Sequence, residues 1–203
     1  MRALRESVTL SAIVLALLTG CAATEAPGTT IAVGDVDFTG PWAKEFSDAY
    51  RKATSPFVKA ALRDGKISDQ EFAEMEQKFR SCLADASVGF DGFGPGGSYS
   101  TENLNGISTS ENQAATDRCT DESGQYPIGT FYYWVKSNPR NLDGPTIIAA
   151  CFVKKKVVPP GYSAKDYTRD SQNDSFPFST HDGEGAKVMQ ECSYDPLGLM
   201  NAD

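Results

Sequence analysis

Apolar residues recur at steps of three and four between Asp64 and Leu83, and this spacing predicts one long amphipathic helix. Phe72, Met75 and Phe79 lie on one helix face, and charged residues occupy the opposite face. The run Ser68-Asp69-Gln70-Glu71 has the spacing of a capping box, in which each end residue accepts a hydrogen bond from the backbone N–H of the other. Gly65 supplies the positive φ that ends a preceding helix. The pattern therefore predicts a helix stop, a capped start and one buried face.

Shorter helices are predicted on both sides of this segment. Their starts carry a proline in the first turn or a Ser or Asp cap. We expect them to start at Pro41, at Ser55-Pro56, at Ser110 (a second capping box that opens a helix carrying Cys119), at Asp143 and at Ser163, with a last helix near residues 185–192.

The aromatic run from Phe131 to Val135 is ambiguous. Its composition is typical of a strand, whereas its position between Pro127 and Pro139 suits a short helix. We favour the helix.

Strand signals are few. Residues 88–93 alternate in polarity, residues 98–104 are expected to pair back on them, and the glycines between 92 and 97 predict the connecting loop. Residues 169–182 are polar and are predicted as a surface loop. The predicted fold is mainly α with a minor β component, an irregular α+β arrangement in one compact, disulfide-bonded domain.

The N-terminus has the organisation of an export signal. Two arginines precede an apolar run from Ser7 to Leu18, which is too short to span a bilayer and suits a signal peptide. The run ends in Leu18-Thr19-Gly20-Cys21, which resembles the bacterial lipobox. That resemblance implies cleavage before Cys21 and a diacylglyceryl group on its sulfur. We therefore assign residues 1–20 to a lipoprotein signal peptide, 21–36 to a lipidated tether and 37–203 to the folded domain.

Four further cysteines agree with export. Cys82, Cys119, Cys151 and Cys192 form an even set, which in an exported chain implies two disulfides with three possible connectivities. The similar sequence around Cys82 and Cys151, each followed by a second cysteine at a comparable distance, favours Cys82–Cys119 and Cys151–Cys192. Zinc is the competing use of four cysteines, but the chain has no Cys-x-x-Cys pair.

The formal net charge of −8 argues against nucleic acid as a partner and against electrostatic docking on anionic lipid.

Several of these features occur together. Together they resemble small exported lipoproteins of Gram-positive actinobacteria. The features that carry the resemblance are the lipobox, the Asp64-Gly65-x-Ile67 turn with its capping box, a helix ending in Cys82-Leu83, a Cys followed by Val158-Pro159-Pro160-Gly161-Tyr162, and a closing Cys192-x-x-x-Pro196. The resemblance implies a place in the cell envelope, on the outer face of the plasma membrane, and implies no activity.

The sequence offers only weak candidates for a metal site or for a nucleophilic catalytic site. Residues 60–71 resemble part of an EF-hand loop, but Ala60 and Leu62 stand where calcium needs side-chain oxygens, and capping explains Glu71. His181 is the one histidine, in a polar stretch without a nucleophile-elbow sequence. We expect no metal site and no cofactor.

Two candidate sites remain from the residue pattern. Asp166, Asp170 and Asp174 recur at four-residue steps and could serve acid–base chemistry of the glycosidase type. Tyr132, Tyr133 and Trp134 could line a ligand groove, although aromatic residues more often fill a core. We favour a membrane-anchored, non-enzymatic envelope lipoprotein that binds an unknown partner or ligand. The alternative is an envelope hydrolase that uses paired acidic residues.

Overall fold

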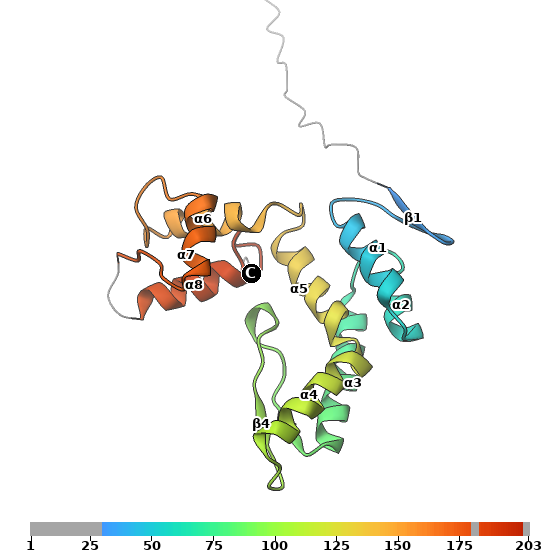
Figure 1. The fold of residues 1–203 in the computed structure, drawn as a ribbon. Helices are drawn as coiled ribbons and strands as arrows, with labels where there is room; N and C mark the ends of the chain where they lie inside the picture. The colour runs from blue at the N-terminus through green and yellow to red at the C-terminus, as the bar shows by residue number, and fades with distance from the viewer. Residues whose placement is uncertain (1–29, 180–182, 201–203) are drawn as a thin grey trace, which may run out of the picture.

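The computed structural model describes residues 30–179 and 183–200, and within these ranges the chain is mainly helical with two small two-stranded sheets. The elements form two lobes (Figure 1). The N-terminal lobe contains β1 (Ile31–Val33), β2 (Val36–Phe38), α1 (Ala43–Lys52), α2 (Pro56–Leu62), α3 (Asp69–Asp85), β3 (Val88–Phe90), the 3₁₀ turn η1 (Pro95–Gly97), β4 (Thr101–Asn103), α4 (Thr109–Ser123), the π-turn η2 (Gln125–Gly129) and α5 (Thr130–Ser137). The C-terminal lobe contains α6 (Gly144–Lys154), α7 (Ala164–Gln172) and α8 (Glu184–Tyr194).

The chain becomes regular earlier than expected. β1 and β2 form an antiparallel hairpin that pairs Ile31 with Phe38, and β1 and the first residue of β2 lie inside the range assigned to the tether. Val36 and Phe38 are buried. Because these apolar side chains gain more by packing on the lobe than by hydration, the domain extends back to Ile31.

The predicted helices of the N-terminal lobe are present, with two differences in their starts. α1 follows Trp42, so Pro41 precedes the helix and does not lie in its first turn. α4 is capped by Ser108 and Glu111 rather than by the predicted pair beginning at Ser110. Ser108-Thr109-Ser110-Glu111 also has the capping-box spacing, and its glutamate binds the N-cap backbone as an ion, which makes it the stronger cap.

The long central helix is capped as predicted. The Ser68 hydroxyl accepts from the Glu71 N–H at 3.2 Å, and the Glu71 carboxylate accepts from the Ser68 N–H at 2.8 Å. Gly65 has a φ of +70° just after α2. The inward face of α3, with Met75, Phe79 and Leu83 fully buried, forms the middle of the larger hydrophobic cluster.

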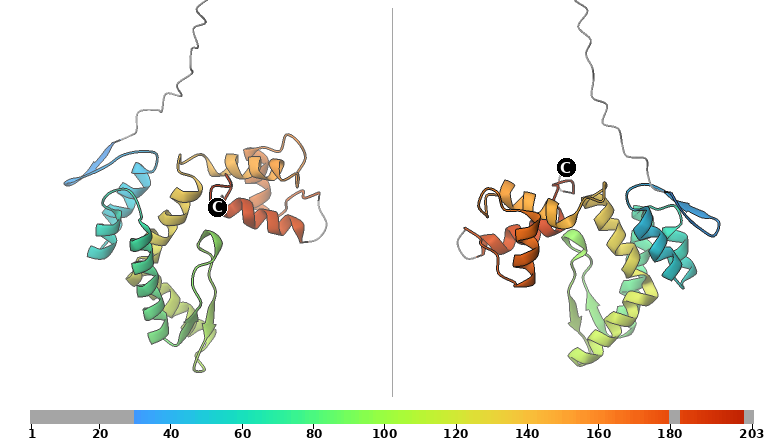
Figure 2. Two further views of the ribbon diagram at one scale, coloured as in Figure 1. Left: turned by 180° about the vertical axis from the view of Figure 1, so that it is seen from behind. Right: turned by 45° about the horizontal axis from the view of Figure 1, so that its top comes forward.

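The β3–β4 hairpin is antiparallel, as predicted, and pairs Val88 with Asn103. Its strands are held to α4 by Asn112, whose side chain accepts from the Thr101 hydroxyl at 3.0 Å and donates to the Asn103 side chain at 2.7 Å. The hairpin tip rises beside α5 toward the end of α8 (Figure 2).

Residues 131–135 are helical, within α5. The loop from α5 to α6 is closed by Asn138, which donates to the Leu142 carbonyl at 2.8 Å and accepts from the Leu142 N–H at 2.9 Å. The Trp42 indole donates to the Asn138 carbonyl at 2.9 Å, so this loop is also fastened to the start of α1.

The C-terminal lobe has its own smaller hydrophobic cluster, built around Phe152. The prediction of a loop over residues 169–182 is wrong in its first part, because α7 continues to Gln172. Phe176 and Phe178 follow it and pack on Phe152 at centroid distances of 5.9 and 5.4 Å. Phe176 and Phe178, the aromatic residues of an otherwise polar segment, thus pack against the hydrophobic cluster of this lobe.

The structure contains the disulfides Cys82–Cys119 and Cys151–Cys192, the pairing favoured above. The first joins α3 to α4 within the N-terminal lobe, and the second joins α6 to α8 within the C-terminal lobe. Each lobe therefore has one covalent link of its own.

Candidate functional site

A surface groove of about 480 Å³ lies where α1, α2, η2 and α5 meet. We call it the Trp134 groove. One side is apolar and the other is polar with a negative excess. The apolar side comprises Val58, Tyr126, Pro127, Phe131 and Trp134, and the polar side includes Glu45, Asp48, Lys52 and Asp121.

The apolar side exposes two aromatic rings. Tyr126 is 65% exposed and Trp134 is 50% exposed, the highest values among the large hydrophobic side chains of the described residues. Trp134 contacts Trp42 and Phe131 at centroid distances of 6.1 and 6.4 Å. Phe131 in turn stacks on the buried Phe46 at 4.4 Å. The Trp134 indole is thus held in place by Trp42 and Phe131 while part of its surface remains exposed. An aromatic ring held in this way binds a ligand with little loss of conformational entropy.

Tyr126 reaches the groove because the turn after α4 is pressed against α2. Gly124 has a φ of +75°, and a Cβ built on it would lie 2.5 Å from the Val58 side chain. Ile128 is fully buried two residues after Tyr126. Gly124 and Ile128 together hold the turn against the lobe, and the Tyr126 side chain extends from the turn into solvent.

The polar side holds one carboxylate oxygen without a partner. Glu45 Oε2 is buried and is the one buried side-chain oxygen or nitrogen of the described residues that lacks a hydrogen bond. Asp48, one turn later on α1, is already paired with Lys44 and Arg51. The Lys44 hydrogen bond lowers the pKa of Asp48. A buried oxygen without a donor costs the fold free energy.

The predicted groove of Tyr132, Tyr133 and Trp134 does not form as one surface, because successive residues of a helix point about 100° apart. Tyr132 stacks on Phe72 at 4.0 Å and donates to Asp69 at 3.0 Å. Tyr133 and Trp134 share a hollow of about 140 Å³ beside Gly96 and Gly97. Of the three, only Trp134 lines the larger groove.

Sequence reasoning missed Tyr126, Phe131 and Glu45 as parts of this site. One signal was available, since Tyr126 lies between Gly124 and Pro127 in a turn, where an aromatic side chain is commonly exposed. Phe131 lies three residues before Trp134 on α5, so helix spacing alone brings these two together. Glu45 joins them only through the packing of α1 on α5.

Two of the three aspartates at four-residue steps, Asp166 and Asp170, have structural roles. Asp166 caps α7 through Ser163, and its pKa is lowered by the Ser163 hydroxyl and backbone and then by Arg169. Asp170 is buried and accepts from Arg169 Nε at 2.7 Å and from the Tyr162 hydroxyl at 3.0 Å. Its pKa is lowered, chiefly by Arg169. A general acid needs the opposite shift. Asp174 is exposed beyond the end of α7.

The EF-hand-like stretch is occupied by its own capping bonds. Asp64 accepts from the Lys66 N–H at 3.0 Å, and Glu71 holds the N–H and hydroxyl of Ser68. Within residues 30–179 and 183–200, no group of three or more His, Cys, Asp or Glu side chains is arranged to hold a metal ion.

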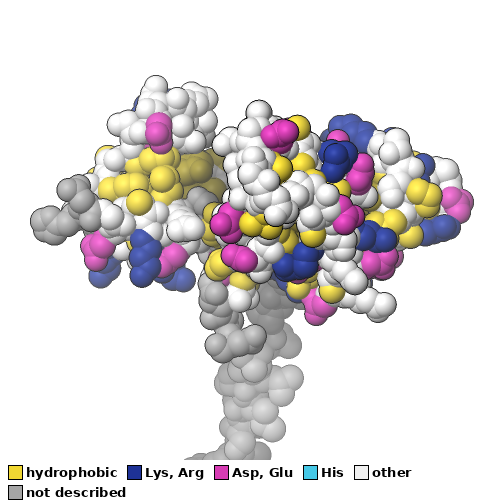
Figure 3. Space-filling view, turned by 90° about the horizontal axis from the view of Figure 1, so that it is seen from below, with side chains coloured by type: hydrophobic (Ala, Val, Ile, Leu, Met, Phe, Trp, Pro, Cys, Tyr) yellow, Lys and Arg dark blue, Asp and Glu magenta, His cyan; other side chains and the backbone are white. Residues whose placement is uncertain are grey.

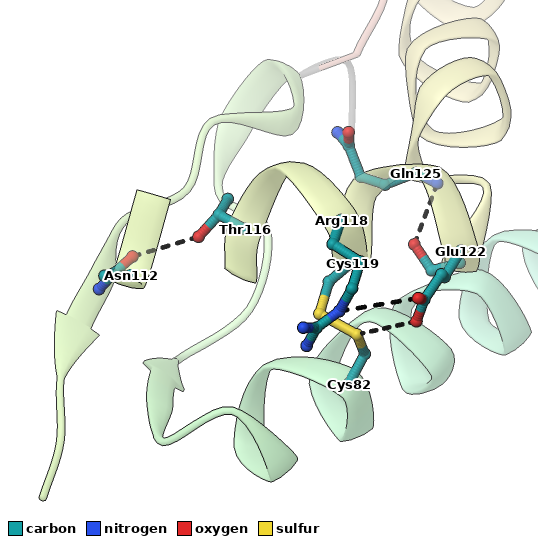
Figure 4. Close-up of a disulfide and its surroundings, with 8 residues drawn as sticks. Cys82, Asn112, Thr116, Arg118, Cys119, Glu122 and Gln125 are labelled. Atoms are coloured by element: carbon teal, nitrogen blue, oxygen red, sulfur yellow. Dashed lines mark hydrogen bonds and ion pairs between the residues drawn. A yellow bond between two sulfur atoms is a disulfide. The ribbon is translucent and has the colours of Figure 1, made fainter. Parts of the chain in front are cut away.

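A larger surface depression of about 790 Å³ is lined in part by Cys82, whose disulfide with Cys119 is drawn in Figure 4. Glu122 Oε2 lies 3.5 Å from Cys82 Sγ, and Glu122 pairs with Arg118 at 3.6 Å. Lys78 and Glu74 form a second pair on the facing helix at 3.4 Å. Four of its five charged residues are engaged in these two pairs and no exposed aromatic ring lines it, so we do not assign a ligand to it.

The C-terminal lobe exposes part of its hydrophobic cluster. Figure 3 shows hydrophobic side chains gathered on the left, over α6–α8, whereas the N-terminal lobe on the right shows acidic and basic groups intermixed. The side chains of this cluster that remain partly exposed include Tyr167, Phe176 and Phe178.

Two sequence-derived candidates, the lipidation site Cys21 and the lone His181, lie outside the described residues. The two disulfides indicate an oxidising, extracytoplasmic environment. Among the helices that the structure describes, none combines the length and the apolar character needed to cross a membrane. Comparison with protein-family models, with curated proteins and with solved structures gave no match for this chain.

Proposed function

We propose that the chain is an exported lipoprotein, anchored through Cys21 to the outer face of the plasma membrane, that acts as a non-enzymatic binding module. The leader and the lipobox-like Leu18-Thr19-Gly20-Cys21 support the anchor. The disulfides support an extracytoplasmic location.

The observation that carries the binding role is the Trp134 groove. It combines exposed aromatic rings on well-supported elements with a polar side that carries more acidic than basic residues. Its volume lies within the range of about 300–1,000 Å³ that is usual for ligand sites. Two of the candidate acid–base aspartates, Asp166 and Asp170, are instead engaged in a helix cap and an ion pair, with lowered pKa values.

The anchor is tested by intact-mass analysis of protein extracted from membranes with detergent. We expect loss of residues 1–20 and the added mass of a diacylglyceryl group, and release of Cys21→Ala protein from the membrane fraction. Recovery of a full-length, unmodified chain in the soluble fraction would contradict the anchor.

The binding role is tested on whole cells by placing a photo-crosslinking amino acid at Tyr126, which lies in the groove, or at Leu104, which is exposed at the end of β4. We expect discrete cross-linked adducts from position 126 and not from position 104, with their yield reduced by Trp134→Ala. Equal adducts at both positions, insensitive to Trp134→Ala, would contradict a role for the groove.

A further inference from the structure

We propose that Cys82 is a site of thiol–disulfide exchange, where a small external thiol opens the Cys82–Cys119 bridge and becomes bonded to Cys82, and where the Glu122 carboxylate selects against anionic thiols. This inference uses neither the Trp134 groove nor Cys21, so it goes beyond the proposed function and does not depend on it.

The two bridges differ in exposure. Cys119, Cys151 and Cys192 are buried, with exposed fractions of 0%, 7% and 0%. Cys82 is half-buried and lines the depression of about 790 Å³ between α3 and α4. Because exchange requires the attacking thiolate to reach a sulfur atom, Cys82 is the most accessible point of attack among the four bridged cysteines.

The reaction is a substitution at sulfur. The external thiolate bonds to Cys82 Sγ, the Cys82–Cys119 bond breaks, and its electron pair leaves with Cys119 Sγ, which takes a proton from water. A second small thiol then attacks the external sulfur of this mixed disulfide and releases Cys82 as a free thiol. The two small thiols are oxidised to their own disulfide, and the protein bridge is reduced.

Glu122 places a negative charge beside the reacting sulfur. Its Oε2 lies 3.5 Å from Cys82 Sγ, and Figure 4 shows the carboxylate pointing toward that sulfur. Its Oε1 lies 3.6 Å from Arg118 Nε, but both side chains of this pair are more than half exposed, so solvent weakens the compensation. An incoming thiolate therefore meets a like charge. The repulsion is larger for a thiol with a second negative charge and smaller for one with an ammonium group.

The N-terminal lobe has a core that does not depend on this bridge alone. Phe79 and Leu83 of α3 and Ala115 of α4 are buried in the same large hydrophobic cluster as Cys119. In the C-terminal lobe, by contrast, Cys151 and Cys192 are two of the five buried hydrophobic residues. Opening of Cys82–Cys119 therefore leaves α3 and α4 packed together, and the bridge can close again.

The test uses purified Cys21→Ala protein, in which four cysteines remain. The probes are mercaptoacetate, 2-mercaptoethanol and cysteamine, whose second group is negative, neutral and positive. The reaction is stopped with acid at successive times, free thiols are alkylated, and mass spectrometry of the peptides shows which cysteine holds the small thiol. Glu122→Gln keeps the side-chain shape and removes the charge. Glu74→Gln is the matched control, because Glu74 lines the same depression and pairs with Lys78.

We expect Cys82–Cys119 to open at least about tenfold faster than Cys151–Cys192, with the small thiol bonded to Cys82. Glu122→Gln should speed the reaction of mercaptoacetate about fivefold and that of cysteamine by less than about twofold, and added salt should reduce this difference. Glu74→Gln should leave each rate within about twofold of its value in the Glu74 protein. Each ratio compares one thiol with itself, so the different acidities of the thiols cancel.

The other outcomes overturn the inference in distinguishable ways. Equal rates at the two bridges, or a small thiol divided evenly between Cys82 and Cys119, would refute the site, because a chain that unfolds before it reacts exposes every sulfur alike. The same effect of Glu122→Gln on all three thiols, or an equal effect of Glu74→Gln, would refute the role of Glu122. No reaction of Cys82–Cys119 with any of the three thiols would refute the inference as a whole. The proposed function would stand in each case, because it is tested at Cys21 and at Tyr126.

Discussion

Serine side chains define where three helices begin. Ser68, Ser108 and Ser163 each accept from the backbone N–H three residues later, and the acidic residue at that position binds back to the N–H of the serine. By contrast, Ser55 stands at the N-cap of α2 without a side-chain capping bond, where Pro56 follows directly. The same residue type thus serves different purposes at two helix starts.

This contrast gives a matched pair of substitutions. We expect Ser68→Ala to lower the free energy of unfolding by about 1 kcal/mol, because the Ser68 hydroxyl no longer accepts from the Glu71 N–H or donates to the Glu71 carboxylate. Ser55→Ala should change it by less than about 0.5 kcal/mol. Urea unfolding followed by circular dichroism measures both, and equal losses would show that the capping bonds of Ser68 do not stabilise α3.

Calcium provides a second test of the same turn. Because the Glu71 carboxylate is engaged with Ser68, and Ala60 and Leu62 offer no side-chain oxygens, we expect millimolar calcium to leave the melting temperature unchanged. Calorimetric binding that Glu71→Gln abolishes would contradict the capping interpretation.

The buried Asp170 predicts a specific dependence on pH. Arg169, and then the Tyr162 hydroxyl, hold its pKa below the ordinary value of 3.8 in the folded state. Since the folded pKa lies below the unfolded one, the carboxylate stabilises the fold above about 3.8 and this contribution disappears as pH falls through the folded pKa. We expect the stability difference between the natural chain and Asp170→Asn to shrink over that acid range in urea titrations. Gln172→Ala, on the same helix, is the uncharged control, and a difference for Asp170→Asn that stays constant with pH would refute the linkage.

At the scale of elements, the β3–β4 hairpin connects the two lobes. Its tip, η1, lies so close to α8 that a Cβ on Gly96 would meet the Tyr194 side chain at 2.4 Å, and a Cβ on Gly97 would meet Tyr133 at 2.7 Å. The glycines that predict a loop from sequence are therefore also required for a close contact between segments far apart in the chain.

Gly96 and Gly106 separate these two requirements. Both have positive φ, +66° and +77°, but nothing lies within 4 Å of a Cβ on Gly106. We expect Gly106→Ala to cost about 1 kcal/mol for the backbone conformation alone. Gly96→Ala should cost about 3 kcal/mol, because overpacking against Tyr194 is added. Thermal unfolding compares the two variants, and equal costs would show that the hairpin tip does not press on α8.

At the scale of the whole molecule, the buried residues form two clusters of unequal size. The C-terminal cluster has five buried hydrophobic residues: Cys151, Phe152, Val157, Val158 and Cys192. Two of these five are the disulfide itself. A core this small leaves little hydrophobic free energy to set against chain entropy, so the disulfide matters more to this lobe than Cys82–Cys119 does to the other.

We expect removal of either disulfide by paired Cys→Ala substitution to cost about 4 kcal/mol on the chain-entropy model. The consequences should differ in extent. Hydrogen exchange should show that Cys151→Ala with Cys192→Ala exposes the amides of α6–α8 while α3 stays protected. Loss of protection in both lobes together would show that the two clusters unfold as one unit.

Much of this organisation is accessible to sequence reasoning because its causes are local. A capping box spans four residues, an amphipathic face repeats within one helix, and a glycine turn depends on its own φ, so the helices and the second hairpin could be predicted. The start of α4 was misplaced by a choice between two local capping patterns, whereas two larger errors arose where distant packing decided the outcome. The first hairpin exists because Val36 and Phe38 are buried, and α7 is followed by two aromatic residues that pack on Phe152.

The candidate site divides in the same way. By itself the sequence determined the disulfide pairing, the negative charge and the helical class, since each follows from residue type or from spacing along the chain. Only the tertiary structure decided that Tyr132 packs inward on Phe72 while Trp134 stays exposed, and that Glu45 and Tyr126 lie beside it. These residues come from α1, η2 and α5, and their proximity depends on how α1 packs against α5 and how closely Gly124 approaches α2, which no local pattern encodes.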